Sequence, residues 1–181
     1  MLRKSILIAM VLIFAFAGFA FKKSSVNTGE DKKQKESAEI QWYSFDKGME
    51  KAQAENKVLV VDFYTDWCHW CKEMEKQTYS EKNIVKYASK KLIMAKLNAE
   101  TEKKYKFRKA EYSGRQLSQI FGVTGFPTTA FVKSNGELIT AVSGFIPPEK
   151  FIHILKYLAE DHYETMKFDD FVKQEEAKNK S

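Results

Sequence analysis

The only two cysteines among the 181 residues, Cys68 and Cys71, lie three positions apart. The hydrophobic stretch 58–64 comes just before them, and the helix-like polar stretch 72–77 comes just after them. This order predicts a buried strand that leads into a helix with both thiols on its first turn. Such thiols can close a small disulfide ring, and a helix N-terminus stabilises negative charge on the first sulfur. The pattern therefore predicts thiol redox chemistry.

The N-terminal segment has the composition of an export signal. Arg3 and Lys4 precede the stretch 6–21, which carries no charge. The triplets AFA at 15–17 and GFA at 18–20 fit the small-x-small pattern of a cleavage site, but the apolar stretch is also close to the minimum length of a membrane helix. Residues 1–21 are therefore either a signal peptide or an N-terminal membrane anchor formed by residues 5–21. Both alternatives place the rest of the chain in the periplasm or at the outer face of the cytoplasmic membrane.

Exported proteins often use cysteines as structural crosslinks. A disulfide between residues three apart closes too short a loop to stabilise a fold much, so Cys68 and Cys71 are interpreted as a reactive pair. A half zinc site with His69 is the alternative, but structural zinc sites need four ligands, and His153 and His162 are far along the chain. We expect no metal and no organic cofactor beside the redox-active disulfide Cys68–Cys71.

Composition and charge fit one compact domain with polar extensions. Apolar residues make up 44% of the chain, which is enough for a core, and the formal net charge is +6. The excess charge is modest and scattered, as on a solvated surface, so we expect no nucleic-acid binding. Residues 22–38 predict a polar flexible linker, residues 39–161 a folded domain, and residues 162–181 a charged tail in which Phe168 and Phe171 can dock.

Hydrophobic patterns and turn signals predict an α/β fold: a central mixed β-sheet flanked by helices on both faces. An antiparallel hairpin with an Asn135-Gly136 turn is expected near the end of the sheet. The basic and aromatic stretch 101–121 is interpreted as mainly helix and loop, with a docking surface for an acidic partner as the alternative to a solvated amphipathic helix. The expected strands are 40–45, 57–64, 92–97, 128–133 and 137–143, and the expected helices are 46–56, 66–78, 80–90 and 148–161.

The sequence resembles the thioredoxin family over about residues 40–160, and four separated motifs support this resemblance. They are VDFYTDWCHWCK at 61–72, KLN at 96–98, GVTGFPT at 122–128 and Gly144. This resemblance implies a thioredoxin fold and thiol–disulfide exchange.

The likeness is strongest to the C-terminal, periplasmic thioredoxin-like domains of the DsbD family of transmembrane thiol reductant transporters. The similar stretches are DWC at 66–68, CKEMEK at 71–76 and VSGF at 142–145. We expect this chain to be a stand-alone relative of those domains.

The resemblance implies different roles for the residues around the disulfide. Cys68 would be the attacking thiolate, and Cys71, one turn further on and deeper, would resolve the mixed disulfide. Asp62 lies in an apolar strand, where burial should raise its pKa, and it would exchange protons with Cys71. Glu75 follows Cys71 on the same helix face, and Lys96 matches a lysine near the buried aspartate of thioredoxins. The alternative for Asp62 is a purely structural role, and the alternative for Glu75 is a solvated residue on the helix surface.

Five further residues are expected to bind substrate at the rim of the site. Pro127 would be a cis-proline facing the disulfide, and the backbone at Phe126 would pair with an extended substrate. Trp67, His69 and Trp70 would complete the rim, with Trp67 packed partly inward and Trp70 exposed. His69-Trp70 departs from the Gly-Pro of common thioredoxins. A protonated His69 would make the disulfide more oxidising, which leaves the direction of the reaction open.

Together these observations predict an exported thiol–disulfide oxidoreductase that reduces disulfide-bonded exported proteins. A membrane or periplasmic thiol donor would return the Cys68–Cys71 pair to its reduced state. Two alternatives remain. One is an oxidase or isomerase of exported proteins, and the other is a non-catalytic module that binds clients in the groove at Trp70 and Phe126.

Overall fold

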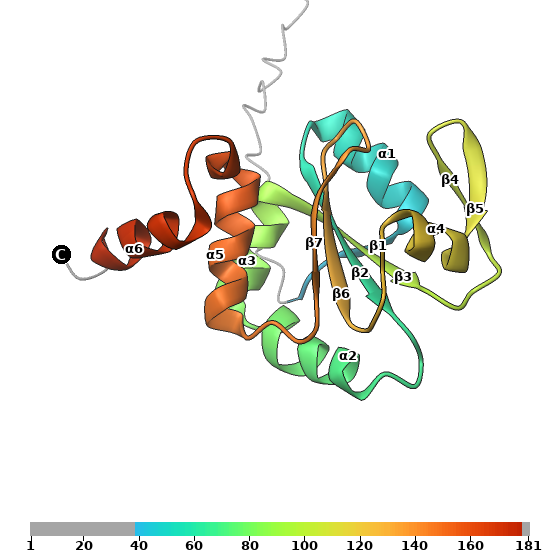
Figure 1. Cartoon of the computed structure of the whole chain (residues 1–181), viewed down its shortest axis with the longest axis horizontal. Helices are drawn as coiled ribbons and strands as arrows, with labels where there is room; N and C mark the ends of the chain where they lie inside the picture. Colours follow the sequence, from blue (N-terminus) through green and yellow to red (C-terminus); the bar gives the residue numbers. More distant parts are fainter. Residues whose placement is uncertain (1–38, 179–181) are drawn as a thin grey trace, which may run out of the picture. The chain divides into compact units, whose positions relative to one another are not determined.

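The computed structural model describes residues 39–178 (Figure 1). The chain divides into two compact units, and the described residues belong to the second, residues 35–181. The expected signal or anchor segment and the expected linker, residues 1–38, lie outside the described residues. Between residues 39 and 178, no helix has both the length and the apolar character needed to cross a membrane.

The order of elements is that of an α/β protein. The strands are β1 (Trp42–Ser44), β2 (Val58–Tyr64), β3 (Leu92–Asn98), β4 (Lys104–Phe107), β5 (Ala110–Ser113), β6 (Thr128–Val132) and β7 (Leu138–Ser143). The helices are α1 (Phe45–Glu55), α2 (His69–Met74), α3 (Lys82–Lys91), α4 (Gly114–Ile120), α5 (Pro148–Ala159) and α6 (Phe168–Lys178). A π-helical turn, η1 (Glu75–Tyr79), follows α2, and a 3-10 turn, η2 (His162–Glu164), follows α5.

The central sheet of the described part has five strands in the order β1-β3-β2-β6-β7. β2 is parallel to β3 and antiparallel to β6, which makes the sheet mixed. The middle five residues of β2 are buried, as expected for an apolar strand paired on both sides. The predicted α/β fold with a central mixed sheet is therefore confirmed.

Alternate residues of β2 point into two separate apolar clusters, one on each face of the sheet. Leu59, Val61 and Phe63 pack with buried residues of α1, α4 and the β4–β5 hairpin. Val60 packs with buried residues of η1, α3 and α5 (Figure 1). Asp62 is two residues from Val60, so its carboxyl group lies on the face that carries η1, α3 and α5.

The prediction of helix and loop for residues 101–121 is wrong for residues 104–107 and 110–113, which are strands. β4 and β5 form an antiparallel hairpin, and the helix occupies only the last part, α4. The physical reason is a period of two, since Tyr105 and Phe107 are buried while Lys104 and Lys106, which alternate with them, are exposed. Both buried rings pack against Phe45, at centroid distances of 6.4 and 5.4 Å. Burial of two aromatic rings on one side of the ribbon outweighs the helical propensity of the lysines that alternate with them.

The segment after α5 packs on that helix through aromatic rings. Phe171 is buried, and its ring centroid lies 5.4 Å from that of Tyr157. Tyr157 also contacts the ring of Phe168 at 5.3 Å. Nearby, Lys156 of α5 donates to a carboxylate oxygen of Glu175 in α6 at 2.7 Å.

The connection from α2 to α3 passes through the π-helical turn η1. A π-helical turn contains more residues than an α-helical turn, so it rotates the following side chains relative to an uninterrupted α-helix. η1 ends at Tyr79, which is buried on the α3–α5 face of the sheet. This turn therefore carries a tyrosine from the active-site helix into the core.

The packing of α6 yields a stability prediction. Replacing Phe171 by Ala should lower the free energy of unfolding by about 3 kcal/mol, because a buried aromatic ring is lost. The exposed Gln174 lies on the same helix, and Gln174→Ala should stay within about 0.5 kcal/mol of the parent. Denaturant unfolding of the three proteins measures both effects. Equal stability of Phe171→Ala and Gln174→Ala would show that the docking of α6 does not stabilise the fold.

Candidate active site

The disulfide lies at the start of α2, just after the loop that follows β2. Cys68 is the N-cap residue of α2, Cys71 lies in the first turn, and their sulfurs are bonded to each other. The backbone N–H of Cys71 donates to Sγ of Cys68 at 3.1 Å. A helix-terminal amide therefore points at the sulfur that the sequence predicts to attack, where it stabilises negative charge.

The two cysteines do not differ in depth as expected. Cys68 is 4% exposed and Cys71 is 6% exposed, so the prediction that Cys71 is the deeper of the two is wrong for the disulfide form. The bond between the sulfurs holds both side chains in one turn of the chain, and neighbouring side chains shield both of them.

Asp62 is a buried carboxyl group in the central strand, with 2% of its surface exposed. Its Oδ1 accepts a hydrogen bond from the Tyr79 hydroxyl at 3.2 Å. Burial raises the pKa of Asp62 to about 6, against the charge of Lys96 and the hydrogen bond from Tyr79, which both lower this pKa. A carboxyl group with this pKa can accept and return a proton near neutral pH.

Lys96 links Asp62 to a second carboxylate. It is the register partner of Asp62 on β3, and its Nζ forms an ion pair with Oε1 of Glu75. The ammonium group also lies over the ring of Trp42, 4.8 Å from the centroid. Burial lowers the pKa of Lys96, and the charge of Asp62 opposes that shift. The half-exposed Glu75 and the buried Asp62 thus share one cation.

Trp67 lies on the surface rather than in the core. Its side chain is 66% exposed, so the expectation that it packs partly inward is wrong. The indole N–H donates to Oε2 of Glu100 at 3.0 Å, and the ring meets the ring of Phe126 edge-on at 6.0 Å. Trp67 adjoins Cys68 in sequence, so this contact brings the loop containing Phe126 and Pro127 beside the disulfide.

A second aromatic contact lies on the other side of the cysteines. Trp70, which adjoins Cys71 in sequence, is 56% exposed, as the sequence analysis expected. Its ring lies 5.8 Å from the ring of Phe145 and 5.7 Å from that of His69. Exposed rings on both sides of a disulfide form a surface that an extended peptide can contact.

The Phe126–Pro127 peptide bond is cis in the structure. Pro127 precedes β6, and its carbonyl oxygen accepts a hydrogen bond from the backbone N–H of Gly144 at 2.8 Å. Gly144 has a φ of 91°, a conformation that favours glycine. The two loops that flank the β6–β7 hairpin are therefore tied together next to Phe126 and Phe145.

Sequence analysis missed Tyr79 and Thr129, the two hydroxyl-bearing residues beside Asp62. Thr129 is the register partner of Asp62 on β6, and its Oγ1 lies 3.3 Å from the hydroxyl oxygen of Tyr79. The spacing of four between Cys71, Glu75 and Tyr79 was an available signal, since such residues share one helix face. No short-range pattern shows that this face meets Asp62.

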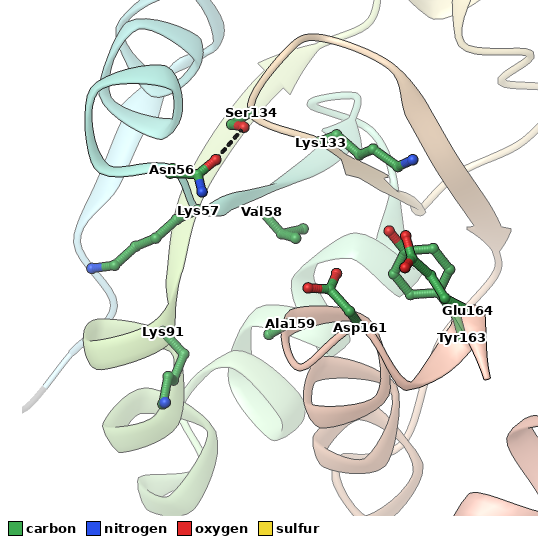
Figure 2. A pocket seen from close by; sticks show the side chains of 10 residues that line it. All are labelled: Asn56, Lys57, Val58, Lys91, Lys133, Ser134, Ala159, Asp161, Tyr163 and Glu164. Atoms are coloured by element: carbon green, nitrogen blue, oxygen red, sulfur yellow. Dashed lines mark hydrogen bonds between the residues drawn. The ribbon is translucent and has the colours of Figure 1, made fainter. Parts of the chain in front are cut away.

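A pocket of about 370 Å³ lies away from the disulfide, around the start of β2 (Figure 2). The side chains of Asn56 and Ser134 are hydrogen-bonded at its wall, at 2.8 Å. The cysteines follow the other end of this strand, whose seven residues span roughly 20 Å. No residue predicted for the active site lines the pocket. Its lining residues are Asn56, Lys57, Val58, Lys91, Lys133, Ser134, Ala159, Asp161, Tyr163 and Glu164.

Comparison with known proteins places this geometry in a family. The thioredoxin-like domain family matches residues 45–159. The thiol:disulfide interchange protein DsbD of Yersinia pestis is 36% identical over 108 residues, which cover 58% of this chain and 16% of that protein.

Two solved structures share the fold at lower sequence identity. A thioredoxin-fold protein from Helicobacter pylori superposes with a TM-score of 0.60 at 21% identity, over 68% of this chain and 82% of that chain. The DsbH oxidoreductase superposes with a TM-score of 0.54 at 21% identity, over 74% of this chain and 95% of that chain.

The chain belongs to the thioredoxin-like family, which confirms the predicted resemblance. Its disulfide occupies the helix start that follows the central strand, a position where thiol–disulfide exchange can occur. Related DsbD proteins are much longer, since the chain spans about a sixth of the length of the Yersinia pestis protein.

The raised pKa of Asp62 makes the stability of the oxidised protein depend on pH. The folded-state pKa of about 6 lies above the ordinary value of 3.8, so folding favours the protonated form. This stabilisation is complete below about pH 4 and is lost as the pH rises through about 6. A pKa shift of one unit corresponds to about 1.4 kcal/mol, so loss of the Asp62 contribution should lower the free energy of unfolding by roughly 3 kcal/mol.

Urea unfolding from pH 4 to pH 7 measures the effect against Asp62→Asn, which keeps the shape and does not titrate. All other carboxyl groups titrate in both proteins, so their contributions cancel in the difference. The variant should gain stability relative to the parent as the pH rises. A difference that stays constant over this range would contradict a raised pKa of Asp62.

Proposed function

We propose that this chain is an exported reductase of protein disulfides, with Cys68 and Cys71 as the reacting pair. The observation that carries the proposal is a disulfide at the N-terminus of α2 with a buried carboxyl group, Asp62, on the strand that leads to it. A carboxylate near a dithiol disfavours the thiolate, and a less stable reduced form gives up its electrons more readily. The electrostatics on this side of the site therefore support the reducing direction.

The reaction begins with the dithiol form. The Cys68 thiolate attacks one sulfur of the substrate disulfide, and the bond between the two substrate sulfurs breaks. A mixed disulfide joins Cys68 to the substrate, and the second substrate sulfur leaves as a thiolate that takes a proton from solvent. The helix-terminal amide of Cys71, which donates to Sγ of Cys68, stabilises the attacking anion.

Resolution of the mixed disulfide needs a second thiolate. Asp62 accepts the proton of Cys71, whose sulfur then attacks Sγ of Cys68 and releases the other substrate sulfur. The substrate has gained two electrons, and the enzyme dithiol has become the Cys68–Cys71 disulfide. A membrane or periplasmic thiol donor reduces this disulfide and completes the cycle, so the pair needs no metal or organic cofactor.

Glu75 and Lys96 connect Asp62 with solvent. Asp62 is buried, whereas the side chain of Glu75 is 50% exposed and pairs with Lys96, the register partner of Asp62. In the proposed cycle, burial raises the pKa of Asp62 and the charge of Lys96 lowers it, while Glu75 forms an ion pair with the same lysine. Their charges keep the Asp62 carboxyl group able to titrate near neutral pH.

The aromatic contacts on both sides of the disulfide form the substrate groove. Trp67 and Phe126 meet on the Cys68 side, and Trp70 and Phe145 meet on the Cys71 side. An extended substrate would contact these rings and His69, with its backbone paired to the chain at Phe126 and Pro127.

Export places this chemistry in the periplasm or at the outer face of the cytoplasmic membrane. In this proposal, residues 1–21 are the signal peptide or anchor, residues 22–38 the linker and residues 39–161 the catalytic domain. Residues 162–181 form a C-terminal extension, of which Phe171 docks on α5. The substrates are disulfide-bonded exported proteins.

An oxidase or isomerase is the second candidate, because of His69. This residue is exposed and directly follows Cys68, so a positive charge there would stabilise the thiolate and the reduced form. His69 and Asp62 therefore act in opposite directions on the reduction potential.

Trapping of mixed disulfides tests the roles of the two cysteines. In Cys71→Ser the intermediate forms and cannot be resolved, so the variant should accumulate covalent complexes with exported proteins. Cys68→Ser, the matched control, should accumulate far fewer. Non-reducing electrophoresis after acid quenching counts the complexes. Equal trapping by the two variants would overturn the assignment of attacker and resolver, and no trapping by either would favour a non-catalytic binding module.

The reduction potential tests the direction of the reaction. Equilibration with glutathione measures this potential. It should lie closer to that of reducing thioredoxins, about −270 mV, than to that of a strongly oxidising disulfide, about −120 mV. His69→Ala should make the potential more negative, because the variant lacks a positive charge that would stabilise the reduced form. A parent value near −120 mV would favour the oxidase.

A further inference from the structure

Tyr79 has a hydroxyl group that packing alone does not require. The residue is 4% exposed at the end of η1, and its ring meets those of Trp42 and Phe151 edge-on at 5.0 and 5.5 Å. A phenylalanine ring would make the same contacts. Burial of a hydroxyl group is unfavourable unless it is hydrogen-bonded, so the contacts of this oxygen explain why a tyrosine fits here.

The hydroxyl of Tyr79 lies between two buried groups of the central sheet. It donates to Oδ1 of Asp62 at 3.2 Å and lies 3.3 Å from Oγ1 of Thr129. Asp62 and Thr129 are register partners on β2 and β6, and both are buried. The three side chains therefore form one hydrogen-bonded group that joins the active-site helix to the central strands.

A tyrosine hydroxyl has one proton to donate and can also accept, so this group has two arrangements. When Asp62 is charged, the Tyr79 hydroxyl donates to the carboxylate and can accept from Thr129. When Asp62 is protonated, Tyr79 can turn its proton toward Thr129 and accept from the carboxyl group. The hydroxyl can thus serve both protonation states of Asp62 without movement of the backbone.

Other charged groups act on Asp62 from the elements around it. Lys96 faces it from β3, and Glu75 in η1 shares the charge of Lys96. Tyr64 lies two residues on along the same strand. Burial raises its pKa, and the charges of Asp66 and Asp62 add to this shift. Among these groups, Lys96 and Tyr79 favour the charged form of Asp62, and burial opposes both of them. Of these two groups, Tyr79 is the one that donates a hydrogen bond to the Asp62 carboxyl group within the described part of the chain.

We infer that Tyr79 is a positioning residue that orients the Asp62 carboxyl group and sets the pH range in which Asp62 takes the proton of Cys71. The inference rests on the proposed role of Asp62 in resolving the mixed disulfide. Tyr79 itself does not touch the reacting sulfurs in this account, and its effect passes through Asp62.

The first test is the titration of Asp62 in the oxidised full chain, followed by ¹³C NMR of its carboxyl group. Tyr79→Phe keeps the ring and removes the donor, so the titration midpoint should rise by about one pH unit. Asp62→Asn identifies the signal. Tyr87→Phe is the matched control, because its hydroxyl donates to Glu160 at 2.7 Å and its loss should leave the midpoint unchanged.

The second test is the pH dependence of resolution, measured by rapid mixing of the reduced enzyme with a disulfide-bonded peptide. The rate should rise with pH as Asp62 loses its proton, and in Tyr79→Phe this rise should move to higher pH by the same amount as the midpoint. The variant should then be about fivefold slower near pH 6, approach a tenfold difference at lower pH, and nearly equal the parent above pH 8.

A merely structural role gives a different result. If Tyr79→Phe slows resolution by the same factor at every pH and leaves the Asp62 midpoint in place, the inference is overturned. If the midpoint moves but the parent, Tyr79→Phe and Asp62→Asn have the same rate profile, the proposed role of Asp62 fails. The part of the inference that concerns Cys71 fails with it, whereas the shifted midpoint still supports the contact between Tyr79 and Asp62.

Discussion

The pairing of β2 on both sides is the constraint on which the rest of the structure depends. β3 saturates one edge of this strand and β6 saturates the other. A slip of one residue would turn the Asp62 carboxyl group toward the opposite apolar cluster, so the register is strongly determined. The same register pairs Phe63 with Thr128, the residue after Pro127. The end of β2 thereby sets the position of the disulfide and of the loop that flanks it.

The electrostatics of the site follow from a balance around one buried carboxyl group. Burial favours the protonated form of Asp62, whereas Lys96 and the hydroxyl of Tyr79 favour the charged form. Stronger compensation would keep Asp62 charged at all relevant pH values, and weaker compensation would keep it protonated. Either extreme would remove its capacity to take up and return a proton near neutral pH. The chemistry proposed for Cys71 depends on this intermediate state, which costs some stability in the folded protein.

The differences between expectation and structure have a common origin in contacts between distant segments. Trp67 was expected to pack partly inward, but its indole bonds to Glu100 in the loop after β3 and meets Phe126 before β6. Tyr79 was overlooked because its partners, Asp62 and Thr129, lie on strands far from it in the chain. The sequence predicts helix and loop in place of the β4–β5 hairpin because its lysines have fair helical propensity and the alternation spans only a few residues.

By itself, the amino-acid sequence determined the reacting pair, the strand that leads into its helix, the mixed sheet and the burial of Asp62. These features depend on spacing along the chain and on hydrophobic periodicity, which are local properties. Only the tertiary structure decided which groups meet the Asp62 carboxyl, which aromatic rings flank the disulfide, and that residues 104–113 form a hairpin. These outcomes depend on which distant segments pack together, because a side chain's partners are fixed by the joint burial of several elements and not by its neighbours in sequence.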